Sequence, residues 1–154
     1  MLHPESRTSK DDRSNTAPGD VAGGVSGRVP SPCEGIRIAR RFTRPGLHPY
    51  DEVEWELRDA VITNERGEAS FEQRGVEVPK SWSQLATNVV AQKYFRGHLG
   101  SADREHSVKQ LLDRVVRTAG RWGREGGYFA DEADAEAFEA ELCYLLLHQM
   151  LSFN

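Results

Sequence analysis

The hydrophobic and polar residues of this chain follow two different periods, which meet at Pro79. Over residues 50–58 apolar positions alternate with charged ones, and a period of two is typical of a half-buried strand. The apolar face of this stretch consists of Val53, Trp55 and Leu57. Turn-forming residues at 64–67 and a second extended stretch after them predict a β-hairpin over about 50–79.

After Pro79 the apolar residues recur every three or four positions, which is the period of an amphipathic helix. This pattern predicts helices over about 81–96, 103–122 and 131–153. The side chains expected to cap their N-termini are Ser81 or Ser83, Ser101 or Asp103, and Asp131. The expected buried faces are Trp82, Leu85, Val89 and Val90 in the first helix, Val108, Leu111, Leu112, Val115, Ala119 and Trp122 in the second, and Phe138, Leu142, Leu145, Leu146, Met150 and Phe153 in the third.

The first 35 residues show neither period. Ser, Pro, Gly, Asp and Arg dominate this segment, and its few apolar residues are scattered. Such a segment cannot bury enough apolar surface to offset about 1–2 kcal/mol of backbone entropy per residue. We therefore expect a disordered tail over 1–35 and an α+β domain over 36–154, in which a small β-hairpin precedes three helices.

Charge is distributed unevenly along the chain. It carries 20 Lys and Arg against 24 Asp and Glu, and the excess of basic residues lies before residue 47. An acidic domain is a poor partner for phosphate backbones, so we expect no nucleic-acid ligand. No apolar run reaches the roughly 18 residues of a membrane span, and the N-terminus lacks the apolar core of a secretory signal. Two cysteines make no disulfide framework, so we expect a cytoplasmic protein with no membrane partner.

Histidine and cysteine offer little chemistry in this sequence. The five histidines fall in no metal-ligand spacing, so no metal site is assigned. They are His3, His48, His98, His106 and His148. Cys143 lies on an apolar helix face and is expected to be a small buried hydrophobe. Cys33 lies in the predicted tail, where a fixed catalytic geometry is not expected.

Three further patterns have structural explanations. Glu52, Glu54 and Glu56 share the polar face of the predicted strand, and a solvated surface explains them better than acid–base catalysis does. The glycine clusters at 97–100 and 123–127 are expected to terminate helices rather than to bind phosphate or RNA.

A basic run surrounds Phe42, and its role stays open at this stage. Its members are Arg37, Arg40, Arg41 and Arg44. They could contact a nucleotide phosphate, form a solvated edge or contact an acidic neighbour. The residues therefore assign no catalytic, cofactor-binding or metal-binding side chain.

Several longer runs, taken in their order along the chain, carry a more specific signal. They are Arg41–Gly46, His48–Glu56, Val76–Asn88, Gln92–Gly97, Trp122–Arg124 with Gly127–Phe129, and Gln149–Asn154. Together they resemble the N-terminal region of vitamin B12-dependent (class II, adenosylcobalamin-dependent) ribonucleotide reductases. The resemblance covers about residues 36–154.

This resemblance implies a parent oxidoreductase that makes deoxyribonucleotides from ribonucleoside diphosphates for DNA synthesis. In that family a thiyl radical, generated through the cobalt of adenosylcobalamin, acts inside a ten-stranded α/β barrel. No residue of this chain matches the family's catalytic cysteines, radical relay or cofactor-binding segments. Binding of adenosylcobalamin, ribonucleotide substrate and dNTP effectors is therefore expected only in the full enzyme. This chain is expected to be a structural, inactive fragment that stops before the barrel.

The apolar C-terminal run suggests an unfinished interface. A helix that is apolar nearly all round must be covered on more than one side. Leu146, Leu147, Leu151 and Phe153 are thus expected to face the remainder of the reductase, or a second copy of the isolated chain. The alternative hypothesis is a free-standing acidic α+β protein-interaction module.

Overall fold

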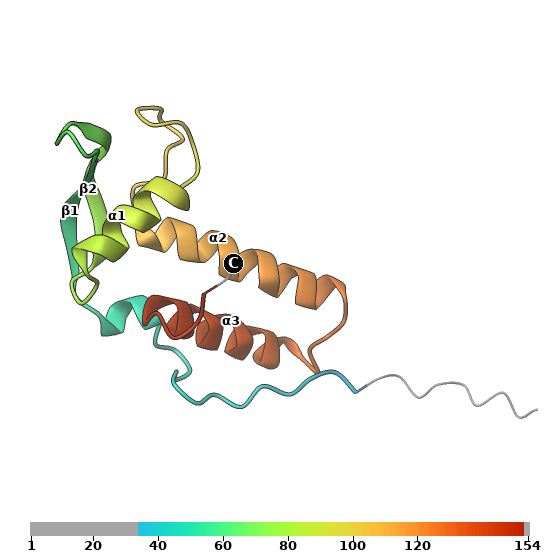
Figure 1. The fold of residues 1–154 in the computed structure, drawn as a ribbon. Coiled ribbons are helices and arrows are strands. Elements are labelled where there is room, and N and C mark those ends of the chain that lie inside the picture. The colour runs from blue at the N-terminus through green and yellow to red at the C-terminus, as the bar shows by residue number, and fades with distance from the viewer. Residues whose placement is uncertain (1–33, 153–154) are drawn as a thin grey trace, which may run out of the picture. The chain divides into compact units, whose positions relative to one another are not determined.

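The computed structural model describes residues 34–152, which form a two-stranded antiparallel sheet and three α-helices (Figure 1). The elements in chain order are the 3-10 helix η1 (Pro49–Glu52), β1 (Trp55–Thr63), β2 (Ala69–Pro79), α1 (Gln84–Lys93), α2 (Val108–Glu125) and α3 (Glu132–Leu147). The predicted α+β class is confirmed. Most of the predicted tail, including Cys33, lies outside the described residues, as does Phe153.

The hairpin turn forms where its residues predicted it. The Asn64 side-chain oxygen accepts hydrogen bonds from the backbone N–H groups of Arg66 and Glu68, and Gly67 takes a φ of +80°. Asn and Gly favour such turns because the first bonds its own backbone and the second tolerates positive φ. Further along, a bulge at Gly75 shifts the register, and the Gly75 N–H donates to the Asp59 carboxylate at 3.0 Å.

The predicted apolar face of β1 is correct for Val53 and Trp55, which are half-buried and pack against the core, but wrong for Leu57. Leu57 is 71% exposed, whereas Ala60 is fully buried together with Val76 and Val78 of β2. The reason is the Arg58 guanidinium, which points inward and donates to carbonyl oxygens beyond the hairpin. A charged side chain can occupy an inner face when every donor finds an acceptor there, and the alternation of residue types does not reveal this.

Helix α1 begins at the predicted Ser83 cap but presents a different face to the hairpin. The Ser83 hydroxyl accepts from the Ala86 N–H at 3.1 Å. Leu85 and Val89, expected inside, are 72% and 40% exposed, while Thr87 and Ala91 are fully buried. The small buried residues allow α1 to lie close against the strands, where packing outweighs the hydrophobicity of single positions.

Helix α2 begins at Ser107, so the predicted caps Ser101 and Asp103 are wrong. Ser107 and Gln110 form a reciprocal capping box. The Gln110 side-chain oxygen accepts a hydrogen bond from the Ser107 N–H at 3.1 Å, and the Ser107 hydroxyl accepts from a backbone N–H in the first turn of the helix. The residues expected to start this helix form a loop instead. Arg104 anchors that loop by donating to the carbonyl oxygens of Phe95 and Gly97 at 2.8 and 3.0 Å.

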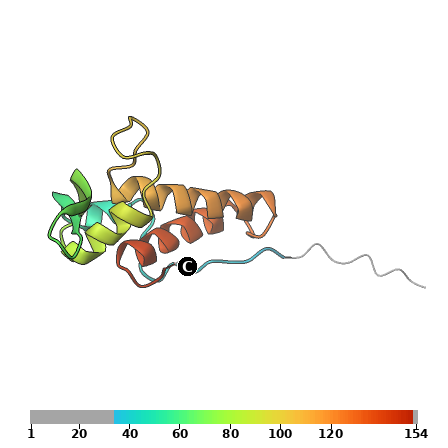
Figure 2. The same ribbon diagram turned by 45° about the horizontal axis from the view of Figure 1, so that its top comes forward.

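Helices α2 and α3 pack as an antiparallel pair through small residues (Figures 1 and 2). A Cβ atom at Gly120 would lie 1.9 Å from a carboxylate oxygen of Glu139, and one at Gly123 would lie 2.3 Å from the Phe129 ring. A side chain at Gly123 would therefore displace the Phe129 ring, and one at Gly120 would push the Glu139 carboxylate aside. Trp122, expected on the buried face, is 61% exposed, whereas Gly120 and Gly123 of the same helix are buried.

Helix α3 begins at the predicted Asp131 cap and ends six residues earlier than predicted, at Leu147. Leu146 and Leu147 are 9% and 1% exposed, so the prediction that they face away from the domain is wrong. The indole Nε1 of Trp82 donates to the Leu147 carbonyl oxygen at 2.8 Å and closes the core over this end of the helix. Met150, expected in the buried face, lies beyond the helix and is 57% exposed.

An extended segment before η1 runs along α3 (Figure 2). The Ile38 N–H donates to the Asp134 carboxylate at 2.7 Å, and Ile36 pairs with Phe129 in an isolated bridge. Gly35, which the sequence placed in the tail, lies so close to Phe129 that a Cβ would meet its backbone at 2.3 Å. The packed domain therefore includes Gly35.

Candidate functional site

The three glutamates of the predicted polar strand face do not form a catalytic pair. Only Glu56 belongs to β1, and it pairs with Arg58. Glu52 ends η1, and Glu54 lies exposed before the strand, where it binds the Lys80 ammonium at 2.9 Å. The prediction that the three share one strand face is thus wrong, because the chain turns through η1 before the strand starts.

Cys143, the cysteine within residues 34–152, is 3% exposed. Burial raises the pKa of its thiol to about 11. The neighbouring Tyr50 hydroxyl donates to the Asp113 carboxylate at 2.9 Å, and burial also raises the pKa of that phenol. At neutral pH the Cys143 thiol is protonated, so the group is a poor nucleophile.

His48 and His148 occupy structural positions at the ends of helices. His48 caps η1, since its Nδ1 accepts from the Tyr50 N–H at 3.2 Å. His148 lies at the C-terminus of α3, with its ring centroid 4.1 Å from that of Tyr144. In the part of the chain that the structure describes, no three His, Cys, Asp or Glu side chains converge closely enough to hold a metal ion.

In both glycine clusters, glycines adopt backbone conformations or close contacts that other residues rarely allow. Gly97 takes a φ of +83° and approaches Arg104 so closely that a Cβ would lie 2.6 Å from its Cα. Gly127 takes a φ of +63° just after α2. These conformations explain the glycines as turn and close-packing residues.

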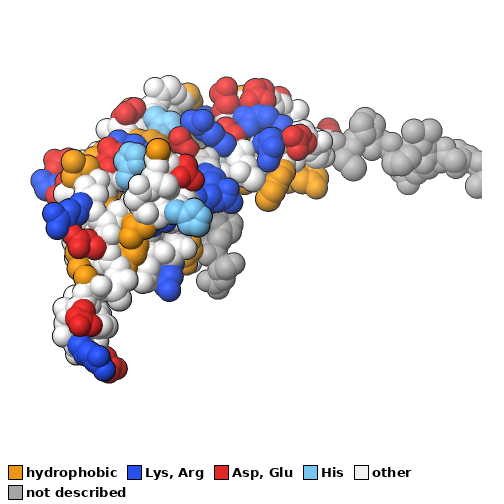
Figure 3. All heavy atoms as spheres, turned by 90° about the horizontal axis from the view of Figure 1, so that it is seen from above, with side chains coloured by type: hydrophobic (Ala, Val, Ile, Leu, Met, Phe, Trp, Pro, Cys, Tyr) orange, Lys and Arg blue, Asp and Glu red, His pale blue; other side chains and the backbone are white. Residues whose placement is uncertain are grey.

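The basic run around Phe42 contacts an acidic residue, Glu141, through its backbone, and these contacts do not involve the arginine side chains. The backbone N–H groups of Arg41, Phe42 and Thr43 all donate to the Glu141 carboxylate, at 2.9–3.0 Å. The Thr43 hydroxyl adds a fourth hydrogen bond at 2.7 Å. The side chain of Arg41 is exposed, and on the face drawn in Figure 3 basic and acidic side chains are interspersed.

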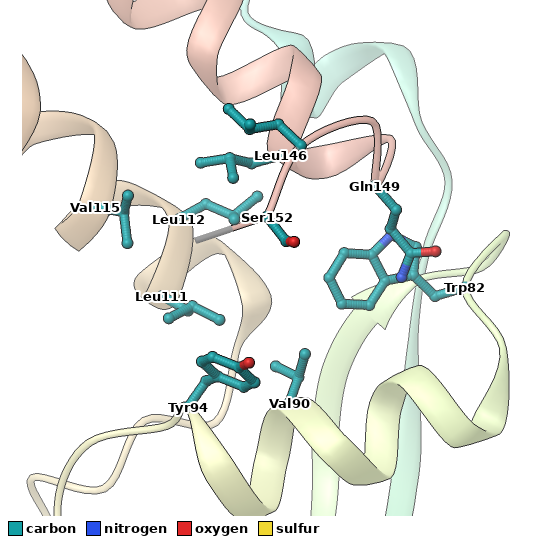
Figure 4. A pocket seen from close by; sticks show the side chains of 10 residues that line it. Trp82, Val90, Tyr94, Leu111, Leu112, Val115, Leu146, Gln149 and Ser152 are labelled. Carbon is teal, nitrogen blue, oxygen red and sulfur yellow. The ribbon is translucent and has the colours of Figure 1, made fainter. Parts of the chain in front are cut away.

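The most distinctive surface feature is an apolar groove between α1, α2 and the end of α3 (Figure 4). Its volume is about 220 Å³. We call it the α1–α2–α3 groove, and its lining residues are Trp82, Val90, Tyr94, Leu111, Leu112, Val115, Leu146, Gln149, Leu151 and Ser152. Tyr94 at the rim is 50% exposed, and Leu151 is 38% exposed. The groove therefore leaves apolar area in contact with water.

Sequence reasoning missed this groove. It assigned Val90, Leu111, Leu112 and Val115 to the core, and helical periodicity cannot distinguish a closed core from a partly open groove. The groove exists because α1 is short and because the chain turns back after Leu147. The chain reversal after Leu147 depends on the left-handed backbone of Gln149, and glutamine is not a residue type that predicts a turn.

The family model of class II vitamin B12-dependent ribonucleotide reductases matches residues 56–149 of this chain. The chain belongs to this family. The reductase from Streptomyces coelicolor is 53% identical over 143 residues, which cover 92% of this chain and 14% of the relative. That from Streptomyces clavuligerus is 58% identical over 122 residues, or 79% of this chain and 13% of the relative. The reductase from Rhodopirellula baltica is 51% identical over 122 residues, which cover 78% of this chain and 12% of the relative.

The chain thus spans about 14% of the length of the vitamin B12-dependent ribonucleotide reductases that it matches. The resemblance found in the sequence to the N-terminal region of this family is confirmed. Within residues 34–152, no helix combines the length and apolar character needed to cross a membrane.

Proposed function

We propose that this chain is the structural N-terminal region of an adenosylcobalamin-dependent ribonucleotide reductase and performs no chemistry itself. The parent reaction would convert ribonucleoside diphosphates to deoxyribonucleotides for DNA synthesis, in the cytoplasm. The observation that carries the proposal is the 53% identity over 92% of this chain to a reductase of which it covers 14%. The partner implied is the remainder of the reductase.

The chemistry of the described residues supports a structural role. Thiyl-radical reduction requires thiols that reach the substrate, whereas Cys143 is 3% exposed and has a raised pKa. The Glu54 and Glu77 carboxylates pair with Lys80 and Lys109 at 2.9 and 2.8 Å. None of these groups combines exposure with an unpaired, reactive state.

The α1–α2–α3 groove does not fit the cofactor. Pockets for drug-sized ligands have about 300–1,000 Å³, with polar groups that fix the ligand's orientation. The α1–α2–α3 groove has about 220 Å³ and is lined mainly by aliphatic and aromatic side chains. We therefore assign no cobalamin contact to this groove.

The test uses the purified chain and the Streptomyces coelicolor reductase lacking its matched region. We expect the chain alone to give no turnover in a dithiol-dependent reductase assay and no absorbance change on titration with adenosylcobalamin. We expect it to bind the shortened reductase in a pull-down, with an unrelated acidic domain as the control. Turnover by the chain alone would refute the structural role. A folded chain that fails to bind the shortened reductase would instead favour the free-standing interaction module.

A further inference from the structure

Helix α1, which lies beside the hairpin (Figure 1), is bonded to the backbone of β1 by two side-chain amides. The Gln84 amide donates to the Asp59 carbonyl oxygen at 2.8 Å, and the Asn88 amide donates to that of Val61, also at 2.8 Å. The Gln84 amide also donates to the Asn88 side-chain oxygen at 2.8 Å, so the two side chains form one linked unit. Carbonyl groups two residues apart in a strand point to the same side, and here that side of β1 faces α1.

These amides face the strand although hydrophobicity favours the neighbouring side chains there. Leu85 and Val89, each one position further along, are 72% and 40% exposed, whereas Asn88 is half-buried. A helix on a protein surface normally turns its apolar side chains inwards, and Asn is a poor helix former. The orientation of α1 therefore gives up apolar burial and helix propensity, and it gains the hydrogen bonds to β1.

The part of β1 under these amides is suited to pairing with another strand. Residues 60–63 are uncharged, and Val61, Ile62 and Thr63 are β-branched, which favours strands. Val61 is 39% exposed, and within residues 34–152 the sheet contains no third strand beside β1. An uncovered edge with these properties is a template for a strand from another molecule.

We propose that Gln84 and Asn88 close the edge of β1 and so prevent a second copy of this chain from pairing with it. A second copy fits this edge because antiparallel pairing of residues 59–63 with themselves, centred on Val61, would set Ala60 opposite Ile62 and would oppose no like charges. Such a pairing has the twofold symmetry of most homodimers. The inference concerns the domain itself and does not depend on the proposed function.

The test compares the association constants of the full chain and of its Gln84→Ala/Asn88→Ala variant by sedimentation equilibrium. Alanine has the highest helix propensity, so these substitutions do not weaken α1 through propensity. We expect the association constant to rise by about tenfold or more, because two carbonyl groups become free for intermolecular hydrogen bonds. The amide protons of residues 59–63 should also become more protected from hydrogen exchange as the protein concentration rises. Lys93→Ala, at an exposed position of the same helix, is the matched control and should associate as the wild type does.

A third substitution shows where the two copies meet. Val61→Lys, added to the double variant, places two like charges opposite each other at the centre of the proposed pairing. It should therefore return the association constant to the wild-type value.

Two results would overturn the proposal. One is a folded double variant that associates no more strongly than the wild type. The other is an association that Val61→Lys leaves unchanged, since another surface would then be responsible. Circular dichroism reports whether each variant is folded, and Asn88→Ala alone, judged by the same criteria, replaces the double variant if that variant unfolds.

Discussion

Removal of the Glu141 carboxylate should release the segment that runs along α3. In the structure this carboxylate accepts hydrogen bonds from three consecutive backbone N–H groups and from the Thr43 hydroxyl, all at 2.7–3.0 Å. Glu141→Ala deletes all four acceptor contacts at once. Glu136→Ala, at an exposed position of the same helix, is the matched control.

The magnitude follows from the partly exposed setting of these contacts. A hydrogen bond to a charged group contributes about 1.5–3 kcal/mol when the group is well shielded. Here the donors can return to water once the segment detaches, so we expect the four contacts together to contribute about 2–3 kcal/mol. The free energy of unfolding of a domain is typically about 5–15 kcal/mol, so the loss should be readily measured.

The same carboxylate should make this contribution depend on pH. Burial raises the pKa of Glu141, but hydrogen bonds from Thr43, Phe42 and Arg41 outweigh burial and hold the pKa below its ordinary value. A carboxyl group with a lowered pKa in the folded state stabilises the protein above its unfolded pKa of about 4.3. That stabilisation is lost as the pH falls through the folded-state pKa.

Urea denaturation at pH 7 and at about pH 3.5 measures both effects. We expect Glu141→Ala to unfold at lower urea than the wild type at pH 7, and the difference to shrink at the acid pH. Amide hydrogen exchange at Phe42 and Thr43 should accelerate in the variant at pH 7. The reasoning is refuted if Glu141→Ala and Glu136→Ala are equally stable at pH 7, or if the Glu141→Ala difference is the same at both pH values.

Three further predictions test the end of α3. Leu147→Ala should destabilise the domain by about 2–5 kcal/mol because it empties a fully enclosed site. Leu151→Ala should lower the free energy of unfolding by less than about 1 kcal/mol, and equal urea midpoints for the two variants would contradict the burial of Leu147. Gln149→Gly should raise the free energy of unfolding by about 0.5–1 kcal/mol, because glycine adopts positive φ without strain. Thermal denaturation would detect this stabilisation, and a melting temperature below that of the wild type would argue against the turn. Cys143 should react with a thiol reagent at pH 7.5 only after urea is added, so rapid labelling of the folded chain would contradict its burial.

Local signals predicted the parts of this fold that local chemistry determines. Asn64 and Gly67 predicted the hairpin turn, and Asp131 predicted the start of α3, because each acts on its own backbone. The buried faces were harder. The Arg58 guanidinium lies inside because carbonyl oxygens distant in sequence accept its hydrogen bonds, and no pattern within β1 reveals that.

The same limit explains the errors on the helices. Gly120 and Gly123 interrupt the apolar stripe of α2 in the sequence, yet both are buried, against Glu139 of α3 and against the Phe129 ring. Periodicity therefore placed Trp122 inside when it is 61% exposed. The α1–α2–α3 groove depends on where three helices end relative to one another, and sequence periodicity carries no information on that.

A chimeric reductase tests the central claim most directly. The matched region of the Streptomyces coelicolor enzyme, which is 53% identical to this chain over 143 residues, would be replaced by the corresponding residues of this chain. If the region provides structure and no reacting group, the chimera should retain most of the parent enzyme's turnover, and a chimera with Leu147→Asp should lose it together with the fold. A chimera that folds and binds adenosylcobalamin as the parent does, but reduces no ribonucleotide, would contradict the account.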